Sequence, residues 1–552
     1  MTRLVLLNIT FLLVFCACNS EGESKNKEII AKGGKVYGGV FKLSIPNKPS
    51  GLFPYSSISY YEQQLSSQLY ETLFTSDSTQ KSVGNLAEKY ELLDGGKTFR
   101  IHLRKNVFFH NSGGNLKSQD VFFSLAFLCS SLKENNYSYL FIDKIKGAKV
   151  FYEKSKSTPF DPNNFKGAKI INDFVIDVYL TYPFSQFSQL LSHPNVVILS
   201  YDDYTKNNAR FFKNPLGTGP FILDKISEEK IVITRNDNYW KHDEHGNKLP
   251  FLEAVEAYYA VNERDWFQAG KLDMIQNISS EKLNSLFGNL DEAISGKNQP
   301  HRLFQLKNKN LNFLVYNTVF PPFDNKTNRQ RIHSSINTLA LCESVLDGDG
   351  EPTKNSFVPI NYFKSINNVG QEISLNVESN GKALKKGEKI NFFINKNTSE
   401  LGLKWVNELI LQIQENTGVS INLIKGNNED FERMWKKGEI HIAKYGWAAD
   451  YPDPDSYLGV FYSRSTLAKQ ISFNSAQYDS IYLNSFRKSN RLDRLTAQFV
   501  CDRFLIQNTF VSPLFLQDFI FVVNINMRDF KVNMEGLLDF SSVFYKPVQK
   551  LN

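Results

Sequence analysis

The length of the chain restricts its fold more than any other single feature. A hydrophobic core stops growing at about 250–300 residues, and this chain has 552. Its composition, 41% hydrophobic and 22% charged, is that of an ordinary soluble globular protein. The sequence therefore predicts roughly two to four domains, each with its own core.

The first 18 residues are predicted to be removed rather than folded. Arg3 is followed by an apolar run from Leu4 to Val14, which suits a signal peptide and is too short to span a membrane. Phe15-Cys16-Ala17-Cys18 then resembles a bacterial lipobox, which makes Cys18 the predicted lipidated first residue of the mature protein. The alternative is a plain secretory signal. Both interpretations export the protein to the periplasm or the cell surface.

Residues 19–35 are polar and charged, and predict a flexible tether between lipid and folded protein. No later segment is apolar enough to suggest a membrane span. The formal charge of +7 is spread along the chain without a long basic run, which argues against nucleic-acid binding. Cys129, Cys342 and Cys501 are far apart and predict buried thiols rather than disulfides or metal ligands.

The segment Gly446–Leu458 gathers an aromatic residue, three carboxylates and two prolines. The alternating run before it, residues 439–445, predicts a strand, and the prolines must end that strand because they lack a backbone donor. Trp447 and Asp450 are therefore expected on a stiff loop, where binding groups are often placed. The alternative is an acidic surface turn.

Short motifs follow one another along the chain in a fixed order. The order resembles that of the exported solute-binding proteins of family 5, the oligopeptide-binding receptors of ABC importers. The resemblance covers nearly all of the mature chain, although Leu52-Phe53-Pro54 lacks the acid of the usual Leu-Asp-Pro, which leaves the ligand class open. The motifs are Tyr70-Glu71-Thr72-Leu73, Leu86-Ala87-Glu88, Leu103–His110, Gly217-Thr218-Gly219-Pro220, Arg235–Trp240, Lys248–Leu252 and Trp447–Pro454.

The resemblance implies an α/β protein with a bilobal, periplasmic-binding-protein type II-like fold. Two crossing strands would form the hinge. The first lobe would combine residues 36–75, 196–305 and 511–552, with an extra α/β domain formed by 76–195. The second, ligand-gripping lobe would comprise 306–510.

The same resemblance implies a ligand site around Asp450. The acid of the Trp-x-x-Asp motif would face the ammonium group of a peptide, forming a charge-assisted hydrogen bond. The backbone of Gly446, Trp447, Ala448 and Ala449 could pair with the peptide as an added strand, and the two small alanines would permit close approach. Trp447 is expected either to floor a pocket or to pack in the core.

Tyr60 is a further candidate for the ligand site. It stands at the start of a helix predicted from Tyr60 to Phe74, and the resemblance places this segment near the cleft. The alternative is an aromatic pair with Tyr61 at the solvent edge.

The other acids predict no metal site and no catalysis. Asp453 and Asp455 are expected to cap the following turn, and their spacing from Asp450 is not that of a calcium-binding EF-hand loop. His242-Asp243-Glu244-His245 lies in a hydrophilic run and predicts a solvated loop rather than a metal site. The motifs of serine hydrolases, zinc proteases and P-loop enzymes are absent from the sequence, and no cofactor is expected.

The predicted function is capture of a peptide between two lobes by a monomeric binding protein. The closed form would deliver the peptide to a membrane permease, and a separate ATPase subunit would power uptake. One alternative keeps the binding role with another solute, such as an oligosaccharide or a nickel chelate. The other is an exported hydrolase or surface interaction protein on the same fold. An acid such as Asp450 favours a cationic ligand group over a neutral sugar.

Overall fold

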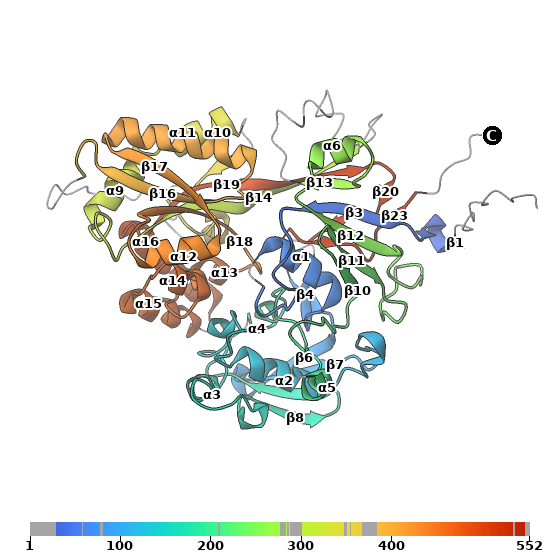
Figure 1. Ribbon diagram of the computed structural model, residues 1–552. Coiled ribbons are helices and arrows are strands. Elements are labelled where there is room, and N and C mark those ends of the chain that lie inside the picture. Colours follow the sequence, from blue (N-terminus) through green and yellow to red (C-terminus); the bar gives the residue numbers. More distant parts are fainter. Residues whose placement is uncertain are drawn as a thin grey trace, which may run out of the picture.

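The computed structural model describes residues 29–546, apart from the gaps given below, and shows a two-lobed α/β protein (Figure 1). Two bodies of sheet and helix lie at the top of the view, and a smaller domain lies below them. The gaps are 58, 78–80, 185, 208–209, 277–282, 284–285, 287–300, 347–349, 354, 367–383, 489 and 534–535.

The first lobe is built on a four-stranded sheet of order β10-β11-β12-β3. Strand β12 runs parallel to β3, while the other neighbours are antiparallel. In β3 the side chains of Phe41, Leu43 and Ile45 are buried in the core, as their alternation predicts. The elements are β3 (Val40–Ile45), α1 (Tyr60–Leu69), β10 (Phe221–Ile226), β11 (Lys230–Arg235), β12 (Ala254–Tyr259) and α6 (Glu263–Gln268).

The small domain contains a separate antiparallel sheet of order β6-β7-β9-β8. Helix α2 packs against β8 and β9. The elements of this region are β4 (Phe74–Ser76), β5 (Ser82–Gly84), β6 (Ala87–Leu93), β7 (Thr98–Leu103), α2 (Ser118–Leu128), α3 (Ala148–Lys154), β8 (Ala168–Asn172), β9 (Val175–Tyr179), α4 (Phe187–Leu190) and α5 (Tyr201–Asn207).

Two long strands carry the chain between the lobes. β14 (His301–Tyr316) and β19 (Val511–Asn524) pair antiparallel from His301↔Asn524 to Val315↔Val511. Near the first lobe β13 (Met274–Gln276) pairs with β19, and in the second lobe β14 pairs with β18 (Ile442–Ala448). The two strands therefore cross from one lobe into the other, as Figure 1 shows.

The second lobe surrounds the far part of this sheet, whose order is β13-β19-β14-β18-β16-β17. None of the helices in the described part of the chain combines the length and the apolarity that a membrane crossing requires. The remaining elements of the lobe are α9 (Lys326–Ser335), α10 (Thr338–Val345), β15 (Gly350–Pro352), β16 (Lys389–Asn395), α11 (Glu400–Thr417), β17 (Ser420–Gly426), α12 (Asn428–Lys436), α13 (Asp455–Leu458), α14 (Thr466–Gln470), α15 (Ala476–Phe486) and α16 (Arg491–Gln507).

A buried carboxylate joins motifs that are far apart in the sequence. The side chain of Glu71 accepts hydrogen bonds from Thr218 Oγ1 at 3.0 Å, Tyr239 Oη at 2.9 Å and Trp240 Nε1 at 2.9 Å. The ammonium group of Lys241 lies 3.0 Å from the same carboxylate. Since a buried charge is stable only when it is paired and hydrogen-bonded, these contacts fix three sequence motifs against one another.

The glycines of the Gly-Thr-Gly motif lie against the end of α1. A Cβ atom at Gly217 would stand 2.0 Å from the carbonyl oxygen of Leu69, and one at Gly219 would stand 2.5 Å from that of Gln68. The amide of Gly219 donates to the Leu69 oxygen at 3.0 Å. Only glycine permits this approach.

Helix α1 consequently ends at Leu69, earlier than its predicted end at Phe74. The carbonyl that would continue the helix is bonded to the Gly-Thr-Gly turn instead. Phe74 begins strand β4.

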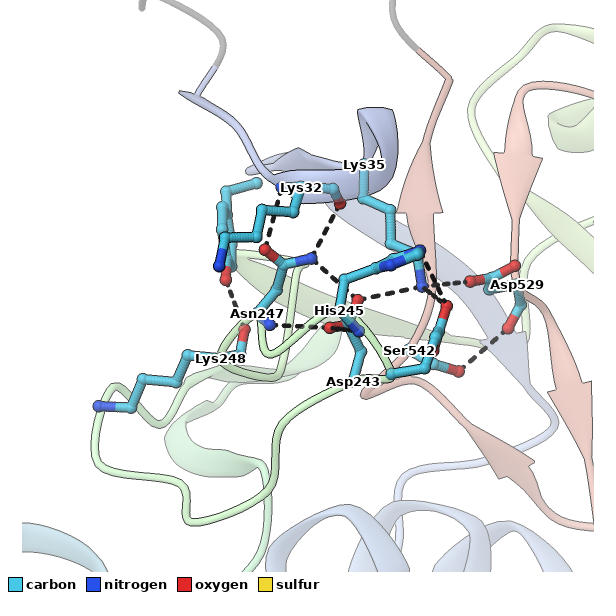
Figure 2. Close-up of polar contacts among 10 residues, drawn as sticks. Lys32, Lys35, Asp243, His245, Asn247, Lys248, Asp529 and Ser542 are labelled. Atoms are coloured by element: carbon cyan, nitrogen blue, oxygen red, sulfur yellow. Dashed lines mark hydrogen bonds and ion pairs between the residues drawn. The ribbon is translucent and has the colours of Figure 1, made fainter.

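The N-terminal end of the described chain is docked on the first lobe (Figure 2). The ammonium group of Lys35, which is buried, lies 3.2 Å from Asp243, 2.9 Å from Glu244 and 2.9 Å from Asp529. Burial alone would lower the pKa of Lys35, but the three carboxylates outweigh it and raise the pKa above its ordinary value. The start and the end of the folded chain are thereby joined.

Asn247 holds the preceding turn through its side-chain amide. Its Oδ1 accepts from the backbone amide of Lys32 at 3.0 Å, and its Nδ2 donates to the Lys32 carbonyl oxygen at 2.9 Å. The ring of His245 covers Gly33 so closely that a Cβ atom there would stand 2.6 Å from it.

The sequence predicts a flexible tether for residues 19–35, but the described part of that segment, from residue 29 onward, is folded against the first lobe. Residues 29–37 form a hairpin in which β1 (Ile29–Ile30) pairs with β2 (Val36–Tyr37). The loop with His242 and His245 accounts for the difference, because Asp243 in that loop is buried against Lys35 rather than solvated. The partners lie more than two hundred positions apart in sequence, so local composition carries no sign of them.

Replacing Glu71 with alanine is expected to destabilise the protein strongly. The change would leave the donors around it buried without an acceptor, at a cost of at least about 3 kcal/mol. Glu88→Ala, at an exposed position of a neighbouring motif, should change the free energy of unfolding by less than about 0.5 kcal/mol. Denaturant unfolding of both variants measures the difference. Similar small losses would contradict the role given to Glu71.

Replacing Lys35 with alanine tests the N-terminal docking. The buried carboxylate of Asp243 would lose its cation, at a cost of about 1–3 kcal/mol. The matched control is Lys48→Ala, because Lys48 pairs with Glu228 at the surface and such pairs contribute about 0–1 kcal/mol. Hydrogen exchange of residues 29–37 should accelerate in the first variant only. Unchanged exchange would show that Lys35 does not hold the hairpin.

Candidate functional site

Strand β18 has one open edge where the proline-containing segment begins. On one side β18 pairs with β14 along its whole length, from Tyr316↔Ile442 to Asn310↔Ala448. On the other side β16 pairs with it only at Ile442 and Ala443. Among the described strands, none pairs with the edge formed by residues 444–448 on that side. Its backbone groups suit the addition of an extended ligand as a further strand.

The strand extends farther along the chain than predicted. The alternating run predicts an end at Tyr445, yet Gly446, Trp447 and Ala448 continue in register with β14. Pairing with β14 stabilises these residues as strand, and the prolines end the strand only beyond them.

Trp447 ties the end of the strand to helix α13. Its indole Nε1 donates to the carbonyl oxygen of Ser456 at 2.9 Å, and the ring packs against the main core. Ala448 and Ala449 are half-buried beside it.

Asp450 lies where the second lobe meets the small domain. Its backbone amide donates to Ser456 Oγ at 2.7 Å, and this hydrogen bond fixes the backbone from which the side chain extends. The side chain is 15% exposed, and Oδ2 lies 3.3 Å from Nε2 of the fully buried His193. The carboxylate is therefore enclosed by residues from both parts of the molecule.

Tyrosines surround this carboxylate. Burial raises the pKa of Tyr137, Tyr139 and Tyr457, and the negative charge of Asp450 raises each of them further. Such apolar surroundings weaken the screening of the carboxylate charge by water. A cationic group placed beside Asp450 would be held more strongly there than at an exposed acid.

Asp453 is a structural residue of the loop. Its carboxylate lies 2.8 Å from Arg494 Nη1 and accepts from Gln498 Nε2 at 3.0 Å, so it is fixed to helix α16. It also accepts from the backbone amide of Asp455 at 3.0 Å, which is the turn-capping contact expected from the sequence.

Asp455 is bound more extensively than a cap requires. Its two oxygens accept from the hydroxyl groups of Tyr451 and Tyr482, each at 2.5 Å. Lys144 of the small domain approaches Oδ2 to 3.9 Å. Asp450 therefore has fewer internal side-chain partners than Asp453 and Asp455.

Further contacts join the second lobe to the small domain. Tyr462 donates to Asp143 Oδ2 at 2.6 Å, and Thr466 Oγ1 donates to the carbonyl oxygen of Asn136 at 2.8 Å. The ammonium group of Lys144 lies 4.3 Å from the ring centre of Phe486. The structure thus shows the lobes in contact around Asp450.

Tyr60 is bound at another place. Its hydroxyl donates to the carbonyl oxygen of Gly536 at 2.7 Å, and its ring stacks on Phe519 of β19 with centres 5.7 Å apart. These contacts join it to a crossing strand and the C-terminal segment, and leave its predicted ligand role without direct support. Cys18 lies outside the described residues.

No sequence pattern points to His193 as the neighbour of Asp450. His193 stands alone in Ser192-His193-Pro194, and nothing in its spacing connects it with a residue more than two hundred positions away. In the described part of the chain, no group of three or more histidine, cysteine or acidic side chains is arranged to hold a metal ion.

The family model described as "Bacterial extracellular solute-binding proteins, family 5 Middle" matches residues 81–468. Among curated proteins, the chain is 25% identical over 509 residues to heme-binding protein A of Haemophilus influenzae. This match covers 87% of the chain and 88% of the relative. It is 21% identical to the oligopeptide-binding protein OppA of Bacillus subtilis, over 98% of this chain and 99% of the relative.

A solved structure has the same fold. The Haemophilus influenzae OppA complex with the peptide RPPGFSPFR superposes with a TM-score of 0.77 at 19% identity. The match covers 92% of this chain and 99% of that structure. The bilobal α/β fold predicted from the motifs is confirmed by this likeness.

The two neighbouring acids should respond differently to truncation. Asp453→Ala would leave Arg494 buried without its anion and is expected to cost about 3 kcal/mol in unfolding free energy. Asp450→Ala removes an acid with fewer internal partners, so its cost should be about 1 kcal/mol or less. Thermal or denaturant unfolding measures both. Equal losses would contradict the division of the segment into structural and ligand-facing acids.

Proposed function

The chain belongs to the bacterial extracellular solute-binding proteins of family 5, and we propose that the solute it captures is a peptide with a free amino terminus. The observation that carries the proposal is the position of Asp450. It is an enclosed carboxylate between the second lobe and the small domain, at the end of a strand whose edge is open. An acid and a strand edge together match the two features that all such peptides share, an ammonium group and an extended backbone.

In this proposal the residues from Gly446 to Asp450 have different roles in binding. Asp450 pairs with the ligand ammonium, and the backbone of Gly446–Ala449 binds the first residues of the peptide. Ala448 and Ala449 allow close approach of the ligand backbone, and Trp447 holds the strand against α13 while presenting its ring at the site. Tyr60 remains a predicted ligand contact.

The energetics favour a peptide over a neutral solute. A hydrogen bond to a charged group contributes about 1.5–3 kcal/mol, and this contribution is larger where tyrosines exclude water. A neutral sugar placed at Asp450 would bury the carboxylate without a countercharge, which is unfavourable. One relative is named heme-binding protein A, and a porphyrin does not supply the ammonium group that Asp450 suits.

The remaining predictions complete the proposal. The protein would be exported, lipidated at Cys18 and anchored to the membrane as a monomer, with residues 36–75, 196–305 and 511–552 in the first lobe. Closure of the lobes around the peptide would present it to an ABC permease with its ATPase. Since the family consists of solute-binding proteins, we assign no catalytic residue, metal or cofactor.

Removing the charge of Asp450 should abolish the preference for a free amino terminus. For wild-type protein, a tripeptide should bind at least about tenfold more tightly than its N-acetylated form, since acetylation removes the ammonium charge. In Asp450→Asn the two forms should bind alike. Isothermal titration calorimetry measures both dissociation constants.

The matched control is Glu429→Gln, at an exposed acid of α12 on the same lobe. It should keep the wild-type ratio of the two dissociation constants. If Asp450→Asn also keeps that ratio, Asp450 is not the ammonium anchor.

A further inference from the structure

His193 of the small domain presents a buried polar atom at the ligand site. The side chain is completely buried, and its Nε2 makes no hydrogen bond to the described residues that meets the usual angles. Nε2 nevertheless lies only 3.3 Å from Asp450 Oδ2. A buried donor without a well-aligned acceptor raises the free energy of the folded protein. At a binding site, such a donor indicates a hydrogen bond that forms with the ligand.

The neighbours of His193 determine which ring nitrogen carries the proton. The backbone amide of Asn195 donates to Nδ1 at 3.0 Å, so Nδ1 must be an acceptor. In the neutral ring the hydrogen therefore sits on Nε2, which faces the site as a donor. A neutral donor leaves the negative charge of Asp450 uncompensated.

The ring is also fixed in place. It meets the ring of Tyr137 edge-on with centres 4.9 Å apart, and the centre of the Tyr451 ring lies 6.3 Å away. Tyr137 in turn donates to the carbonyl oxygen of Ser57 at 2.5 Å. The direction of Nε2–H is therefore set before any ligand arrives.

From this geometry we propose that His193 is a ligand-binding residue, which donates from Nε2 to the carbonyl oxygen of the first peptide residue while Asp450 holds the ammonium group. In an amino-terminal residue these two ligand atoms are three bonds apart, about 3 Å. That separation matches the 3.3 Å between Nε2 and Oδ2. The small domain thus supplies the second half of a clamp for an α-amino acyl group. The inference rests on the peptide ligand proposed above.

The pairing gives the site a selectivity that an acid alone lacks. A simple alkyl amine would satisfy Asp450 but leave His193 without an acceptor. An amino-terminal residue satisfies both groups at once. Because the two groups come from different parts of the molecule, both contacts form only when the lobes are together.

The test uses trialanine and its analogue in which sulfur, a weaker acceptor, replaces the first carbonyl oxygen. Wild-type protein should bind the oxygen form about tenfold more tightly. In His193→Asn the side chain can still accept from the Asn195 amide but is too short to reach the ligand, so the two forms should bind alike. His193→Gln carries an amide nitrogen near the position of Nε2 and should restore part of the preference.

A retained wild-type preference in His193→Asn would overturn the inference. The outcome is separate from that of the ammonium anchor. In Asp450→Asn both forms should weaken while the oxygen preference persists. If Asp450→Asn leaves the ratio for free and acetylated peptides unchanged, the proposed function itself fails and the clamp fails with it.

A second measurement needs no substitution. Nitrogen NMR of the histidine side chains should show the Nε2–H form for His193, and its resonance should shift when trialanine is added. The Nδ1–H form, or a resonance that trialanine leaves unchanged, would overturn the inference even if the variants did not fold.

Discussion

The buried carboxylate of Glu71 is the interaction on which the first lobe depends. Donors from the Gly-Thr-Gly-Pro turn and the Tyr-Trp pair converge on it, and the same turn lies against the end of α1. Removing any partner would leave a buried charge or donor unsatisfied, so the motifs constrain one another. They join the end of α1 to the turn that precedes β10 and to the segment that follows β11.

In the second lobe, the hydrogen bonding of buried carboxylates likewise distinguishes Asp453 and Asp455 from Asp450. Asp453 and Asp455 are saturated by Arg494, Gln498 and tyrosine hydroxyls, which makes the loop stiff. Asp450, in the same short segment, is held mainly through its backbone. A stiff loop fixes the position of the Asp450 carboxylate, and this preorganisation would favour affinity for the ligand proposed above.

The sequence predicts the fold well because its motifs are the residues that meet in the core. Glu71, the glycines at 217 and 219, and Trp240 stand in recognisable patterns, and the resulting two-lobed architecture is confirmed. The separation of Asp450 from its neighbours could also be reasoned from the segment, although its ligand role stays a prediction. The docking of Lys35 and the approach of His193 to Asp450 could not be predicted, because each joins residues more than two hundred positions apart with no local pattern. Helix α1 ends early for the same reason, since its last carbonyl bonds to a distant turn.

Whether this protein holds a peptide can be determined from the mass of the molecule that co-purifies with it. Native mass spectrometry of the purified protein gives the mass of the bound molecule. Mass analysis of the material released on denaturation then identifies that molecule without an assumption about its class. We expect a set of short peptides with unmodified amino termini, which Asp450→Asn should fail to retain. A porphyrin, a sugar, a metal chelate or amino-blocked peptides in place of that set would contradict this expectation.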